Sequence, residues 1–216
     1  MKNLIFLAFI GPLFLTGCKG KMENSPDPPS IAYNDRAVTM MRNYVDRDDI
    51  WPDSAALAQC HSRTDTVRMM MKNIVDSCQI LIDSALLYSP DQYFYYAQKA
   101  TFYACGAYYE EAFQWINKAI EIKDIPELRL GAGMFLQKMG KEKKAGVYYK
   151  QAISNYKTFD TLSRADMMNY TLALSLSGEK EKARQIIDSL VKDTLLKRHL
   201  LLLTENPQEV IDATIP

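Results

Sequence analysis

The sequence predicts an all-α protein, an α-solenoid of consecutive helix pairs with further helices before it and a capping helix after it. From Ile31 onward, apolar residues recur at helical spacing with little of the alternation that marks strands. The 216 residues include only nine prolines. Small residues also recur at one interval, since Ala112 precedes Ala145, and Ala119 precedes Ala152, by 33 positions. A fixed period of this length is typical of stacked helical units.

Three successive units align on these small residues. Another small residue, Ala100 or Gly133, lies twelve positions before the first alanine of a unit, and Gly140 falls at the turn within the second unit. This pattern resembles the tetratricopeptide repeat, a helix–turn–helix of about 34 residues whose small residues let the two helices approach closely. The resemblance implies three repeats in residues 93–194. The third departs from the pattern at Thr171 and Leu190, where small residues are expected.

The segments on either side of the repeats are also predicted to be helical. Residues 31–92 should hold N-terminal helices near 31–48 and 53–61, then one long helix over about 65–88. The end of that helix resembles the end of a degenerate repeat, although it lacks an internal turn. Residues 195–216 are leucine-rich at their start and should form a C-terminal cap, because the last unit of a stack needs its apolar face covered.

The first 17 residues have the features of a bacterial signal peptide. Lys2 is followed by an apolar run over 4–15, shorter than the roughly 20 residues that span a bilayer as a helix. The run ends in Leu15-Thr16-Gly17-Cys18, which resembles the lipobox of bacterial lipoproteins. This resemblance implies cleavage before Cys18 and lipid on its thiol. Residues 18–30 would then form a proline-containing lipidated tether. The alternative is an ordinary secretory signal with a chance cysteine.

The resemblance to lipoproteins also implies a location in the cell envelope. Lys19 stands where an aspartate would favour the inner membrane, so the outer membrane is expected. Residues 19–23 lack a clear acidic export run, which favours the periplasmic face over the cell surface. Asp followed by Ser or Thr and an apolar residue recurs, for example at Asp83 and Asp188. This pattern resembles an O-glycosylation acceptor of Bacteroidota, although helix N-caps are the simpler explanation at several positions.

Composition and motifs argue against several classes of function. Lysine plus arginine equals aspartate plus glutamate at 26 each, so the chain lacks the basic character expected for binding nucleic acid. We find no hydrolase or zinc-protease motif and no phosphate-binding loop, and expect no enzyme activity. Only two histidines and no C-x-x-C pair are present, so no metal and no cofactor are expected. The alternative of an enzyme that uses Cys60 or Cys105 would require an unusually reactive thiol.

The repeat resemblance also predicts a partner-binding groove. It places six residues on the concave face of the stack: Phe94, Thr101, Leu130, Met134, Met168 and Leu172. Such a mostly apolar groove would suit a helix or extended peptide segment of an unidentified envelope protein. If the alignment is displaced by one helix face, these residues belong to the core instead.

The function expected from these features is a non-catalytic scaffold for protein–protein interactions, held on the membrane through lipid on Cys18. Its tether would raise the local concentration of the domain near its partner. The alternative is an accessory lipoprotein for nutrient uptake that binds a glycan or a peptide. The known glycan-binding lipoproteins with similar repeats are typically much longer than this chain.

Overall fold

A computed structural model describes residues 25–45, 61–159 and 161–215 of the chain. Its regular secondary structure within these ranges is entirely helical, which confirms the all-α prediction. The helices are α2 (Pro28–Val45), α4 (His61–Tyr88), α5 (Tyr93–Cys105), α6 (Tyr109–Ile122), α7 (Pro126–Lys138), α8 (Glu142–Tyr156), α9 (Arg164–Leu176), α10 (Lys180–Leu190), α11 (Thr194–Glu205) and α12 (Pro207–Thr214).

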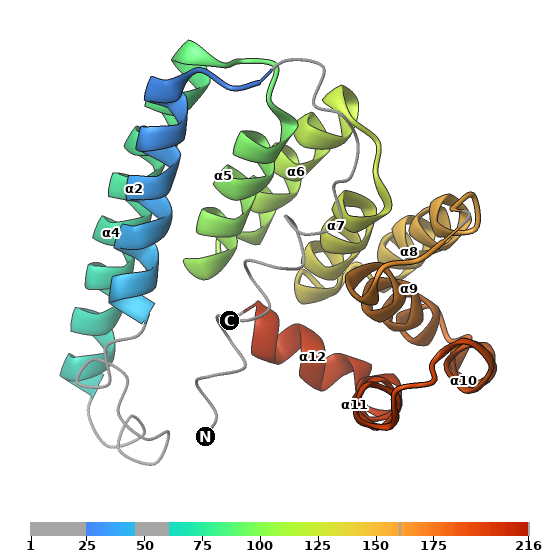
Figure 1. Cartoon of the computed structure of the whole chain (residues 1–216). Coiled ribbons are helices and arrows are strands. Elements are labelled where there is room, and N and C mark those ends of the chain that lie inside the picture. Colours follow the sequence, from blue (N-terminus) through green and yellow to red (C-terminus); the bar gives the residue numbers. More distant parts are fainter. Residues whose placement is uncertain (1–24, 46–60, 160, 216) are drawn as a thin grey trace.

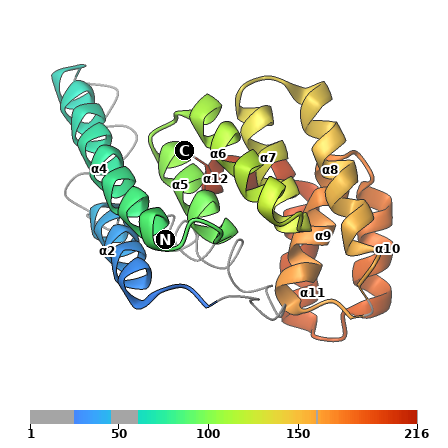
Figure 2. The same ribbon diagram turned by 90° about the horizontal axis from the view of Figure 1, so that it is seen from above.

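Helices that are neighbours in the sequence are also neighbours in space. The pairs α2–α4, α5–α6, α7–α8 and α9–α10 pack tightly, and each pair contacts the next (Figure 2). The pairs follow one another in a curved row, which α11 closes at its C-terminal end (Figure 1). Helix α12 leaves this row and turns back across the side that carries α7 and α9 (Figure 1).

Local sequence signals account for several helix ends. Pro126 lies in the first turn of α7, where its missing N–H costs no hydrogen bond. Helix α9 begins with a capping box, in which the Ser163 hydroxyl accepts from the Asp166 N–H and Asp166 accepts from the Ser163 N–H. Gly140 and Gly178 follow α7 and α9 with φ of +70° and +90°, the left-handed conformation that ends many helices.

The small residues that recur every 33 positions lie at the helix contacts. Ala100, Ala112, Ala119 and Ala152 are completely buried, and Ala145 is 1% exposed. In α9 and α10, the two larger residues that replace expected small ones lie in different surroundings. The Thr171 side chain is buried and donates its hydroxyl to the Met167 carbonyl, whereas Leu190 ends α10 and is exposed.

The N-terminal helices begin earlier than the sequence indicates. Helix α2 starts at Pro28, inside the segment expected to be an extended tether. Ser30 is buried there, and its hydroxyl lies 2.9 Å from that of Tyr95 and 3.0 Å from that of Ser89. The Asp27 N–H also donates to Ser89. The predicted extended tether over 18–30 is therefore wrong for residues 28–30, which form the first turn of α2, and Asp27 is held by Ser89.

Other expectations for this region have different outcomes. The predicted long helix over about 65–88 corresponds to α4. The predicted helix over 53–61 falls mainly outside the described residues, as does Cys18 with the segment before it. Among the residues that the structure describes, no helix has the length and hydropathy needed to cross a bilayer.

Candidate partner-binding site

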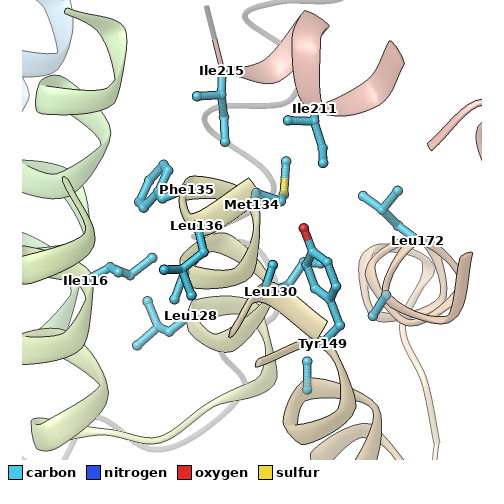
Figure 3. Packing of buried hydrophobic residues seen from close by; sticks show 14 of the residues in the cluster. Ile116, Leu128, Leu130, Met134, Phe135, Leu136, Tyr149, Leu172, Ile211 and Ile215 are labelled. Carbon is cyan, nitrogen blue, oxygen red and sulfur yellow. The ribbon is translucent and has the colours of Figure 1, made fainter. Parts of the chain in front are cut away.

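The inner face, as defined here, is the side of α5, α7 and α9 that carries Thr101, Leu130, Met134 and Leu172. The C-terminal segment of the chain lies on this face. Val210 and Ile211 of α12, together with Ile215, are buried in the same apolar cluster as Leu130, Met134 and Leu172. In Figure 3 the Met134 side chain points toward Ile211 and Ile215, and Leu172 lies beside Ile211. The inner face is thus covered by a helix of its own chain.

This arrangement corrects the expectation of an open groove. Leu130, Met134 and Leu172 are 1–2% exposed, and Thr101 is buried with its hydroxyl donated to the Ala97 carbonyl. These four residues belong to the core while α12 is in place. The physical reason is that three branched apolar residues at the C-terminus have their own apolar surface to bury and reach this face.

The other two predicted groove residues lie elsewhere and are half-buried. The ring of Phe94 packs at the start of α5 against Tyr93 and Tyr95, with ring centroids 5.9 and 4.3 Å away. Met168 belongs to a separate small cluster formed by α9, α10 and α11. The structure therefore brings Thr101, Leu130 and Met134 around one cavity, but it does not bring Phe94 or Met168 to it.

Polar contacts at the rim of the inner face hold the exposed side of α12. The Gln137 amide donates to the Gln208 side chain at 2.6 Å, and Lys138 lies 3.3 Å from the Asp212 carboxylate. Gln137 is itself oriented by Tyr149, whose hydroxyl donates to it at 2.7 Å. These two rim residues, at the end of α7, therefore favour a polar and an acidic residue on the helix they contact.

A small cavity remains where the C-terminal segment meets α5 and α7. It has a volume of about 20 Å³, room for one water-sized molecule. Its wall includes Thr101, Glu127, Met134, Thr214 and Ile215. The Thr214 hydroxyl donates to the Val210 carbonyl at 2.6 Å, within its own helix, so it is not directed at Glu127. The resident helix thus fills this part of the inner face incompletely.

A buried acidic group lies beside that cavity. The pKa of Glu127 is raised to about 7, mainly by burial and in part by the charge of the nearby Asp166 carboxylate. The Tyr156 hydroxyl and Oδ1 of Asp166 are also buried, close to the Glu127 carboxyl group. Burial raises the pKa of Tyr156 well above its usual value, as do the charges of Glu127 and Asp166. The sequence gives no signal of this cluster, because it forms only when α7, α8 and α9 meet.

The described cysteines do not form a reactive centre. Cys78 and Cys105 are free and buried, and burial raises the pKa of each thiol to about 12. A thiol with such a pKa is protonated at neutral pH and is a poor nucleophile. In the described part of the chain, no three His, Cys, Asp or Glu side chains gather in a way that could hold a metal ion.

These features define an all-α protein of consecutively packed helix pairs whose inner face holds a short helix. No protein-family model matches the sequence, and no curated protein shows significant similarity to it.

Proposed function

We propose that the chain is a membrane-anchored, non-catalytic scaffold with tetratricopeptide-like repeats, and that its inner face binds a helical segment of another envelope protein. The observation that carries this proposal is the seating of α12, since the face already accommodates an amphipathic helix through apolar and rim contacts. Binding of a helix in an apolar groove is a common mode of recognition between proteins.

The anchoring part of the proposal rests on the sequence. The lipobox-like Leu15-Thr16-Gly17-Cys18 would place lipid on Cys18, and the Asp27 N–H donates to Ser89 of the folded domain. The short segment between them would keep the domain close to an outer-membrane surface, on the periplasmic face. Confinement of this kind raises the effective concentration of the domain for a partner in the same envelope.

The alternative of glycan binding gains no support from the inner face. A cavity of about 20 Å³ is far smaller than the several hundred Å³ of ordinary ligand pockets. The inner face is also covered by α12, and its buried apolar residues Leu130, Met134 and Ile215 offer no hydrogen bonds to the many hydroxyls of a sugar ring. The inner face therefore suits a protein helix better than a glycan.

The anchor is tested by expression in a bacterial host with an alkyne analogue of palmitate. We expect label on the wild-type chain and on a Cys60→Ala control, and none on Cys18→Ala. Fractionation should place the first two with the membrane, because several acyl chains bind a bilayer firmly and an unlipidated domain does not. Equal labelling of Cys18→Ala and the wild type would contradict the anchor.

A further inference from the structure

Helix α12 is short and depends on the inner face for its helical form. It has eight residues, and its N-cap residue Asn206 makes no side-chain capping bond. Isolated helices of this length are marginal in water. Its buried residues are Val210, Ile211 and Thr214, whereas Gln208, Glu209, Asp212 and Ala213 are exposed. The helix thus resembles a peptide ligand more than one of the long, mutually supporting helices of the row.

The fit of α12 is incomplete at its C-terminal end. The cavity beside Thr214 and Ile215 is also lined by Glu127. The Thr214 side chain is short, and its hydroxyl is used within α12. A longer side chain with a positive charge at this position would enter the cavity and bring its charge toward the Glu127 carboxylate. Such a charge-assisted bond is worth more in a buried site than a bond between neutral groups.

The other contacts of α12 indicate which further residues a helix needs in order to fit the inner face. Two adjacent β-branched residues, Val210 and Ile211, are buried against the cluster that contains Met134 and Leu172. Asp212 lies beside Lys138, and Gln208 beside Gln137, on the exposed side. A helix suited to this face therefore carries a β-branched pair, an acidic residue directly after it, and a cation two residues after the acid.

We propose that α12 is a displaceable internal ligand, and that the partner of the inner face is a short helix of another protein with this pattern, carrying Lys or Arg where α12 has Thr214. The inference rests on the proposed scaffold function. The resident helix keeps Leu130, Met134 and Leu172 covered until the partner competes for them. Because α12 is tethered at Glu205, it acts at a high effective concentration, so the wild-type chain should bind a free peptide only weakly.

The test uses the full chain and a fluorescent peptide with the sequence of residues 206–215 carrying Thr214→Lys. In the chain, Ile211→Asn should release α12, because it buries an amide in an apolar cluster. Glu209→Gln, on the exposed side of α12, is the matched control. Fluorescence anisotropy should show binding to Ile211→Asn at least about tenfold tighter than to the wild type or the control. Equal affinities for all three chains would overturn the proposal.

A second comparison tests the cation. The peptide with Thr214→Lys should bind the Ile211→Asn chain several-fold more tightly than the unmodified peptide. This advantage should disappear when the chain also carries Glu127→Gln. An advantage that persists without the Glu127 carboxylate would overturn the assignment of the cation to this cavity. Concentration-dependent dimers of the Ile211→Asn chain in light scattering would assign the site to a second copy and likewise overturn the proposal.

A measurement on the wild-type chain covers the case in which Ile211→Asn does not fold. Amide hydrogen exchange should be much faster in residues 208–215 than in residues 128–136 of α7, because local opening releases α12 alone. Equal protection of the two segments would show that α12 is a fixed part of the core. That result, combined with a partner bound elsewhere on the domain, would refute the displaceable helix and the inner-face site, and would leave a scaffold that acts through another surface.

Discussion

At the scale of single residues, Glu127 shows how the packing of three helices creates a property that no local pattern carries. A glutamate after Pro126 in the first turn of a helix ordinarily serves the helix dipole and stays ionised. Here it is 6% exposed, and it faces Asp166 and Tyr156. Burial disfavours the ionised form of Glu127, and the neighbouring Asp166 carboxylate disfavours a second negative charge. Together they raise the pKa of Glu127 to about 7.

This raised pKa predicts a loss of stability as pH rises. Since the folded state holds the proton more tightly than the unfolded chain, whose glutamate titrates near 4.5, the stabilisation is complete below 4.5 and is lost as pH passes through about 7. The free energy of unfolding should fall by on the order of 2 kcal/mol between pH 5 and 8. The ionisable groups that act on Glu127 are Asp166 and Tyr156, and the neutral Thr101 and Thr214 line the same cavity.

Urea unfolding of the wild type and of Glu127→Gln at both pH values measures this effect. The glutamine cannot ionise, so the difference between pH 5 and pH 8 should be clearly smaller in the variant. Parallel pH profiles of the two proteins would show that Glu127 is not the responsible group.

At the scale of helices, the contact between α7 and α8 explains why small residues recur through the chain. The Tyr149 ring of α8 lies directly against Gly133 of α7, and a Cβ at Gly133 would be 2.4 Å from its Cε1 atom. The sequence correctly marks Gly133, Ala145 and Ala152 as close-packing positions, because a spacing of small residues is a local property of the chain. It does not show which side chain fills the space that they leave.

Replacement of two glycines in this helix pair separates the effect of close packing on stability from the effect of helix propensity. Gly133→Ala should destabilise the protein by roughly 1–3 kcal/mol, because the buried Tyr149 ring must move. Gly146→Ala in α8 should stabilise it by about 0.5–1 kcal/mol, since an added Cβ there meets nothing within 4 Å. Denaturant midpoints at equal m-values give both numbers. A stabilising Gly133→Ala would contradict the close packing of α7 against α8.

At the scale of the whole molecule, periodicity allowed the row of helices to be predicted but not the path of its last segment. The spacing of small residues correctly located α5 to α10, and the absence of a turn residue located the long helix α4. Residues 207–215 form only a short amphipathic stretch, so nothing local shows that Ile211 and Ile215 reach back to Met134. The sequence therefore predicts an open surface for the six groove residues, although the C-terminal segment with α12 covers four of them.

The proposed function depends on one arrangement, an inner face that holds α12 and exchanges it for a partner helix. Lys138 lies at the rim of this face beside Asp212, and Val147 is 53% exposed on α8 and lines a separate depression between α6 and α8. A photo-reactive amino acid placed at either position, in the full lipidated chain within the native envelope, compares the two surfaces directly.

We expect two cross-links from position 138, one to residues of α12 and one to a second envelope protein. The amount of the second product should increase as that partner becomes more abundant. Position 147 should give neither. Cross-links to another protein only from position 147, or only internal cross-links from position 138 in the native envelope, would contradict the claim that the inner face is the binding surface.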